Sequence, residues 1–128
     1  MTGMFRFMRF GLVGALGFVV DAGVMQLLVT FAGAGAIEAR AVSIPTAVLA
    51  TWALNRTFTF GKAADPALRS LARYVAVSAA GATINFIVYS ALVLASSTLA
   101  ARPMIPLAIA SIVALIFNYL GSKHFAFR

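Results

Sequence analysis

The chain has 128 residues, of which 62% are hydrophobic and only 10% charged, and its mean hydropathy is +1.00. Soluble domains are about 45–50% apolar and about 25% charged, so a soluble globular domain is nearly excluded. The absence of cysteine and the ten glycines and four prolines exclude a disulfide scaffold and collagen. The net charge of +7 comes from cations that stand singly or in pairs between apolar runs, which is typical of membrane proteins and not of nucleic-acid-binding proteins. We therefore expect one small integral membrane domain over residues 1–128.

Four apolar runs predict four transmembrane helices, and hence an all-α membrane protein. They cover residues 10–36, about 41–54, 74 to about 99, and about 103–121. Pro103 and Pro106 suit a helix start, whereas Pro45 falls in the first turns of the second run. The first run is about twice as long as the apolar region of a signal peptide, so we interpret it as a retained span.

The distribution of basic residues predicts the orientation in the membrane. The cations that flank the first run, join the second to the third, or follow the fourth are Arg6, Arg9, Arg56, Lys62, Arg69, Arg73, Lys123 and Arg128. The opposite side has only Arg40 and Arg102, together with Glu38. Because cytoplasmic loops are enriched in Lys and Arg, we expect both termini and the central loop in the cytoplasm.

The two halves of the chain resemble each other and predict a parallel repeat of two helical hairpins. We place repeat one at residues 9–60, a cytoplasmic linker at 61–72 and repeat two at 73–127. The matched pairs are Arg9 with Arg73, Phe10 with Tyr74, Gly17 with Gly81 and Asp21 with Asn85 at a shift of 64, then Trp52 with Tyr119, Arg56 with Lys123 and Phe58 with Phe125 at a shift of 67. Shared aromatic and basic ends alone are the simpler explanation, but here the polar positions match as well.

One carboxylate falls inside a predicted span. Asp21 comes 11 residues after Phe10, which is about 16 Å into the membrane at 1.5 Å per residue. It shares a helix face with Gly14 and Gly17, and carboxylates at this depth are costly and usually functional. A role toward substrate or protons and a structural hydrogen bond to Asn85 are equally good interpretations.

Two cations end the second and fourth spans. Arg56 and Lys123 are each followed by an aromatic-x-Phe sequence, and such cations hold a lipid phosphate or simply extend to anionic lipid within an aromatic belt. Thr51 and Asn118 lie just over a turn before them, where they orient a head group or bond a neighbouring helix. The sequence contains no nucleophile motif, paired carboxylates or metal-ligand cluster, so we expect no enzymatic activity and no cofactor or metal.

These motifs together resemble the GtrA-like family of small polyprenyl-phosphate-linked membrane proteins. The resemblance rests on the start Arg9-Phe10-Gly11-Leu12-Val13-Gly14 and on two helix ends of the form Asn/Thr-x4-Arg/Lys-x-Phe-x-Phe, at residues 51–60 and 118–127. It covers almost the whole chain. One departure is that the first copy has Thr51 where the second has Asn118, with Asn55 next to Arg56 as a substitute to be considered.

The resemblance implies a role in cell-surface polysaccharide synthesis in the bacterial inner membrane. It implies movement of a polyprenyl-phosphate-linked sugar across that membrane, with a glycosyltransferase as partner. Arg56 and Lys123, with Arg9 and Arg73, would then bind the lipid phosphate. Asp21, Asn85, Thr51, Asn55 and Asn118 would be the polar groups within the membrane. Because four helices hardly enclose a sugar path, we also expect a homo-oligomer or a complex.

Two functions of other classes fit the same composition. A small multidrug-type transporter is also short and four-helical, and would use Asp21 to bind a proton or a cation. A membrane anchor for a glycosyltransferase would have the same spans and carry out no transport of its own. The sequence does not separate the anchor from the transporter of lipid-linked sugar.

Overall fold

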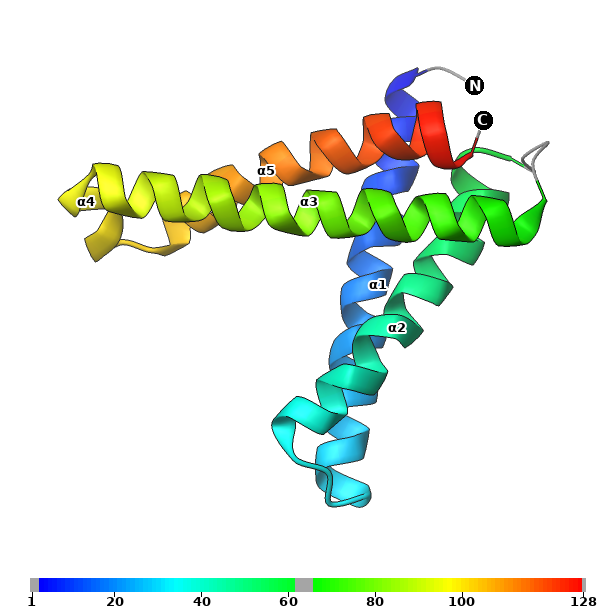
Figure 1. Ribbon diagram of the computed structural model, residues 1–128, viewed down its shortest axis with the longest axis horizontal. Helices are drawn as coiled ribbons and strands as arrows, with labels where there is room; N and C mark the ends of the chain where they lie inside the picture. The colour runs from blue at the N-terminus through cyan, green and yellow to red at the C-terminus, as the bar shows by residue number, and fades with distance from the viewer. Residues whose placement is uncertain (1–2, 62–65, 128) are drawn as a thin grey trace. The chain divides into compact units, whose positions relative to one another are not determined.

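The computed structural model is all-helical over the residues that it describes, 3–61 and 66–127 (Figure 1). The elements are α1 (Gly3–Phe31), α2 (Ala36–Leu54), the π-helix η1 (Asn55–Thr59), α3 (Ala67–Ala95), α4 (Ser97–Ala101), α5 (Met104–Gly121) and the π-helix η2 (Ser122–Ala126). The chain divides into two compact units, Met1–Ala67 and Leu68–Arg128. We call their helices hairpin 1 (α1, α2 and η1) and hairpin 2 (α3, α4, α5 and η2).

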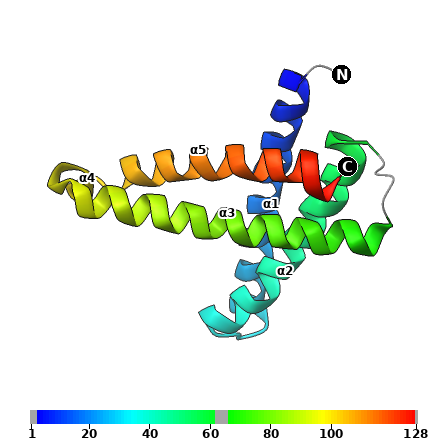
Figure 2. The ribbon, with the colours of Figure 1, turned by 45° about the horizontal axis from the view of Figure 1, so that its top comes forward.

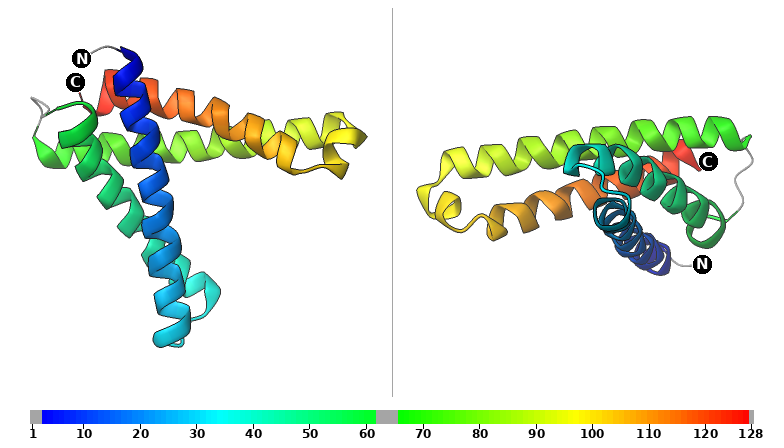
Figure 3. Two further views of the ribbon diagram at one scale, coloured as in Figure 1. Left: turned by 180° about the vertical axis from the view of Figure 1, so that it is seen from behind. Right: turned by 90° about the horizontal axis from the view of Figure 1, so that it is seen from below.

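Hairpin 1 consists of two antiparallel helices joined by a tight turn (Figure 1 and Figure 3). Gly33 ends α1 because it adopts a φ of 69°, and the N–H of Ala34 then donates to the carbonyl of Leu28 at 3.1 Å. This is the glycine-dependent end that helices commonly use. Glu38, in the first turn of α2, folds back so closely that a side chain at Gly35 would collide with its carboxylate. A negative group at this helix start is favourable.

Hairpin 2 pairs the long α3 with α5, and Figure 2 shows the two running side by side. The short helix α4 connects them and lies partly within the run expected to be the third span. Ser96 starts α4, because its Oγ accepts a hydrogen bond from the N–H of Leu99 at 3.3 Å. Pro103 precedes α5, as the sequence predicted for a helix start.

Small residues fill the contact between the helices of each hairpin. Ala39 and Ser43 of α2 are completely buried, as is Ala110 of α5, while Ala114 is 5% exposed. In each helix the two residues are four positions apart, so they lie on the same face of that helix. Helices in a membrane associate through close packing of this kind, since lipid provides no hydrophobic driving force between them.

The all-helical fold is confirmed, whereas the number of spans stays a prediction. Among the described residues, three helices are long and apolar enough to cross a membrane: Gly3–Phe31, Ala67–Ala95 and Met104–Ala126. The second predicted span corresponds to α2, which has 19 residues and carries Glu38 and Arg40 near its start. The orientation with both termini in the cytoplasm also stays a prediction.

The helix bounds differ from the predicted runs at the basic ends. α1 starts at Gly3 and α3 at Ala67, each about two turns before its apolar run, so the last part of the predicted linker 61–72 is helical. Residues 62–65 of that linker, with Lys62, and the terminal Arg128 lie outside the described residues. Arg9 and Arg73 therefore lie within α1 and α3 and not in loops.

Candidate lipid-phosphate site and intramembrane groove

Both hairpins end in one turn of π-helix. The N–H of Phe60 donates to the carbonyl of Asn55 at 2.9 Å, and the N–H of Phe127 donates to the carbonyl of Ser122 at 2.8 Å. Asn55 and Ser122 begin these turns and are 1% and 0% exposed. Single π-helical turns of this kind occur frequently at functional sites. The turns contain Arg56 and Lys123, each at the second position.

An arginine from the first helix holds each π-helical end in place. Arg9 Nη1 donates to the carbonyl of Phe58 at 2.9 Å, and the guanidinium lies 4.6 Å from the centre of the Phe58 ring. Arg73 makes the same contacts with Phe125, at 3.4 Å and 5.1 Å. A guanidinium both donates to carbonyls and stacks on rings, which a lysine does not do equally well. Arg9 and Arg73, predicted as phosphate ligands, thus have a structural role as well.

Aromatic pairs close the same ends. The ring centres of Phe10 and Phe60 are 6.1 Å apart, and those of Tyr74 and Phe127 are 5.5 Å apart. Phe10, Tyr74 and Phe127 are buried. Each pair joins the start of one helix to the end of its neighbour, and contributes about 0.5–1.5 kcal/mol beyond the area that it buries. An aromatic pair therefore stabilises the π-helical end of each hairpin.

Arg56 and Lys123, two of the four cations of the predicted phosphate site, are half-buried at these ends. The Arg56 guanidinium lies 5.8 Å from the centre of the Trp52 ring, which it follows by one helical turn. The described acidic residues are distant along the chain: Glu38 lies at the start of α2, and Asp21 has its own partner. Three cations, Arg6, Arg9 and Arg56, lie at the η1 end of hairpin 1.

Thr51 and Asn118 occupy equivalent places inside the two hairpins. A side chain at Gly17 would collide with the methyl group of Thr51, and one at Gly81 would collide with the amide of Asn118. Both polar side chains thus pack directly onto bare glycine backbone. Thr51 Oγ1 also donates to the carbonyl of Val48 at 3.1 Å.

Asn55, the residue considered as a substitute for Asn118 in hairpin 1, forms a hydrogen bond within η1. Asn55 Oδ1 accepts a hydrogen bond from Thr59 Oγ1 at 2.7 Å, and both side chains are buried. Asn55 therefore stabilises η1 from inside the hairpin, and it does not take the place over glycine that Asn118 has in hairpin 2.

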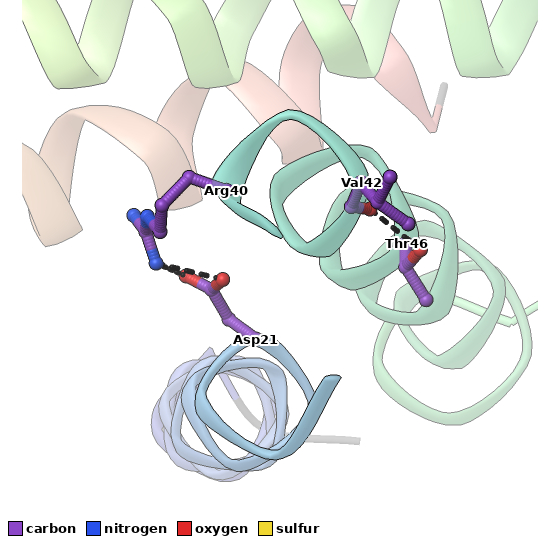
Figure 4. A network of polar contacts seen from close by, with 4 residues as sticks. All are labelled: Asp21, Arg40, Val42 and Thr46. Atoms are coloured by element: carbon purple, nitrogen blue, oxygen red, sulfur yellow. Dashed lines mark hydrogen bonds and ion pairs between the residues drawn. The ribbon is translucent and has the colours of Figure 1, made fainter. Parts of the chain in front are cut away.

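Asp21 forms an ion pair with Arg40 (Figure 4). Arg40 Nη1 donates to both carboxylate oxygens at 2.8 Å, across the space between α1 and α2. The side chains of Arg40 and Asp21 are 45% and 21% exposed. Within hairpin 1, Arg40 is therefore the partner of Asp21, which the sequence did not indicate; the hydrogen bond suggested between Asp21 and Asn85 stays a prediction. The neighbouring Thr46, also in Figure 4, donates only to its own helix, at the carbonyl of Val42.

A groove in hairpin 1 lies next to this ion pair. It has a volume of about 340 Å³ and is lined by Gly14, Gly17, Phe18 and Asp21 of α1 and by α2 side chains between Ile44 and Thr51. Its surface is mostly apolar, and Asp21 provides its charge. The sequence placed Gly14, Gly17 and Asp21 on one face, but it gave no role to Phe18 or Arg40. The described residues contain no group of three His, Cys, Asp or Glu side chains that could hold a metal ion.

Comparison with protein families decides the classification. The family described as GtrA/DPMS, transmembrane domain, matches residues 9–127, which is nearly the whole chain and includes both hairpins. The chain belongs to this family. A search of curated proteins returns no similar sequence. The GtrA resemblance seen in the motifs is therefore confirmed, and the chain is a membrane protein of a family associated with glycan synthesis. The match begins at Arg9 and ends at Phe127, two residues whose side chains help to close the hairpin ends described above.

Proposed function

We propose that this GtrA-family protein binds a polyprenyl phosphate, or its glycosylated form, at the π-helical ends of its hairpins and moves the head group across the bacterial cytoplasmic membrane. The observation that carries the proposal is the matched position of Arg56 and Lys123. Each is half-buried in a π-helical turn that an arginine from the neighbouring helix braces. An aromatic belt with cations extending to the lipid head groups would not require a braced π-helical turn in each hairpin. The repeated arrangement therefore favours a binding role.

The chemistry of these ends suits a lipid phosphate. Phosphate oxygens form short, strong hydrogen bonds with guanidinium and ammonium groups. Arg9 uses Nη1 for the carbonyl of Phe58, and because its side chain is exposed, its charge adds to the positive field of this end. Arg73 is half-buried and makes the corresponding contact with Phe125 in hairpin 2. Cations close to a membrane surface each contribute about 1 kcal/mol toward anionic lipid.

The proposal also includes an assembly of this protein with other chains, because so much apolar surface is exposed. Much of the apolar surface of each hairpin is exposed, and only 11% of the most apolar window of α1 is buried. Lipid chains, the other hairpin, a second copy or a partner must cover that surface. We propose a homo-oligomer, or a complex with a membrane glycosyltransferase, in which both termini face the cytoplasm. The protein itself catalyses no reaction in this proposal.

The ion pair argues against the multidrug-type alternative. A transporter of that class needs a carboxylate that exchanges a proton for a cationic substrate. Here Arg40 already neutralises Asp21, with both carboxylate oxygens at 2.8 Å from one nitrogen. A cationic substrate would have to displace a guanidinium from a bidentate contact, which is unfavourable in a low-dielectric environment.

Binding of a polyprenyl phosphate to purified protein tests the proposal. The variant Arg56→Gln/Lys123→Gln should lower the affinity by about tenfold or more, because hydrogen bonds to charged groups contribute about 1.5–3 kcal/mol each. Arg69→Gln/Arg102→Gln is a matched control with the same net charge, since both residues are exposed. Unchanged affinity in the first variant, or an equal loss in the control, would refute the phosphate role.

A further inference from the structure

The groove of hairpin 1 has the composition of a small-molecule site and not of a simple helix interface. Such sites are mostly apolar, have volumes of about 300–1,000 Å³ and contain a few well-placed polar groups. This groove has about 340 Å³, and glycine forms part of its floor at positions 14 and 17. A Cβ at Gly14 would meet no atom within 4 Å, so no other side chain fills the groove at this position.

Two side chains give the groove its chemical character. Phe18 is 72% exposed and presents an aromatic ring at the groove. Asp21 presents carboxylate oxygens that accept hydrogen bonds from hydroxyl groups, and Arg40 holds that carboxylate in place. The pair has no net charge, so it does not attract a phosphate. A sugar has apolar faces of C–H groups, which pack against an aromatic ring, and hydroxyl groups, which donate hydrogen bonds to a carboxylate. The groove provides both partners, in Phe18 and Asp21.

The position of the groove relates it to the basic end. Thr51, at the border of the groove, precedes Arg56 by five residues, about 7.5 Å along the helix axis. A head group that moves inward from the basic end therefore meets the groove next. Transporters commonly have their substrate sites near the middle of the bilayer, the depth that the sequence assigns to Asp21.

Hairpin 2 does not repeat these groups. At a shift of 64, Phe18 corresponds to Ala82 and Asp21 to Asn85, and at a shift of 67, Arg40 corresponds to Leu107. Asn118 adds an amide over Gly81 where hairpin 1 has the shorter Thr51. The aromatic ring, the carboxylate and the guanidinium occur together only in hairpin 1 among these equivalent positions.

We propose that the groove of hairpin 1 binds the neutral sugar of the glycosylated lipid, with the Asp21 carboxylate accepting hydroxyl hydrogen bonds and Phe18 packing against the sugar ring. This inference rests on the proposed function and assigns the phosphate and the sugar to different places. It also assigns different tasks to the two hairpins. Hairpin 1 selects the glycosylated lipid, whereas both hairpins hold the phosphate.

The test compares two lipids on four proteins. A polyprenyl phosphate and the same lipid with a glucosyl group are titrated into the wild type, Phe18→Leu, Asp21→Asn and Phe86→Leu. Phe86 is the matched control, because it is a 70% exposed ring in hairpin 2. The wild type should prefer the glucosylated lipid by about tenfold, the equivalent of one charge-assisted hydrogen bond. Phe18→Leu and Asp21→Asn should remove most of that preference and leave binding of the bare lipid within about twofold.

Each outcome bears on the proposal. Equal binding of both lipids by the wild type, or a preference that survives in Phe18→Leu and Asp21→Asn, would overturn the sugar site and leave the phosphate site intact. Phe18→Leu removes no charge, so it keeps the test valid if Asp21→Asn does not fold. If neither lipid binds, the proposed function fails, and octyl glucoside then tests the groove alone. Weaker binding of octyl glucoside in Phe18→Leu than in Phe86→Leu would support the groove, and equal binding would overturn it.

Discussion

Gly81→Ala tests how closely the two helices of hairpin 2 pack. The added Cβ would collide with three atoms of the Asn118 amide: Oδ1, Cγ and Nδ2. All three atoms belong to one side-chain amide, so the collision involves the whole amide group of Asn118. The helices must separate, or Asn118 must leave its place. Gly23→Ala is the matched control, because a Cβ at Gly23, also within a membrane helix, meets nothing within 4 Å.

The expected magnitude follows from two opposing terms. Alanine is favoured over glycine inside a helix by about 1 kcal/mol, and this gain applies to both variants. Overpacking costs about 1–3 kcal/mol, and this cost applies to Gly81→Ala alone. The free energy of unfolding should therefore fall by about 1–3 kcal/mol in Gly81→Ala relative to Gly23→Ala. Asn118→Ala should relieve the collision, so the double variant should be more stable than the sum of the single effects predicts.

Equilibrium unfolding in mixed detergent and SDS micelles, followed by circular dichroism, measures these differences. Equal stability of Gly81→Ala and Gly23→Ala would show that Asn118 does not pack on Gly81 as described. A double variant that is merely additive would show that the cost arises elsewhere. Either result would refute the close contact between Asn118 and Gly81.

Three further predictions concern hairpin 1. Asp21→Asn should lower the free energy of unfolding by about 1–3 kcal/mol in the same assay, because the amide keeps one oxygen for Arg40 but loses the charge of the carboxylate. Asp21→Asn/Arg40→Leu should recover part of the loss. Equal stability of the single variant and the wild type would contradict the ion pair. Thr59→Val should cost about 1 kcal/mol, since the buried Oδ1 of Asn55 loses its donor, whereas the exposed Thr57→Val serves as the control. Arg9→Lys should speed amide hydrogen exchange in η1 but not in η2, and equal protection of η1 in both proteins would show that the guanidinium does not brace that end.

The sequence was sufficient for the helical fold and the family because both depend on features that repeat along the chain. Long apolar runs define helices without reference to tertiary contacts, and the paired motifs at residues 51–60 and 118–127 identify the family. The π-helical ends were not predictable, since no residue pattern distinguishes one wider turn from a continued α-helix. Their positions became visible only through backbone hydrogen bonds such as that from Phe60 to Asn55.

The partner of Asp21 shows a second limit of the sequence. The sequence predicts Arg40 on the outer side, because it stands between the first two apolar runs. In the structure its side chain reaches back along the hairpin to Asp21 instead. Two opposite charges in one predicted hairpin are a signal for such a pair. The repeat instead directed attention to Asn85, the equivalent of Asp21 in hairpin 2.

Transbilayer movement of a glucosylated polyprenyl phosphate in proteoliposomes tests the central claim most directly. Lipid that reaches the outer leaflet is measured by its accessibility to a membrane-impermeant glycosidase. The account predicts that wild-type protein accelerates this movement over protein-free vesicles, that Arg56→Gln/Lys123→Gln abolishes the acceleration, and that Arg69→Gln/Arg102→Gln retains it. Movement no faster than in protein-free vesicles, with folded wild-type protein that binds the lipid, would contradict translocation and favour an anchor for a glycosyltransferase.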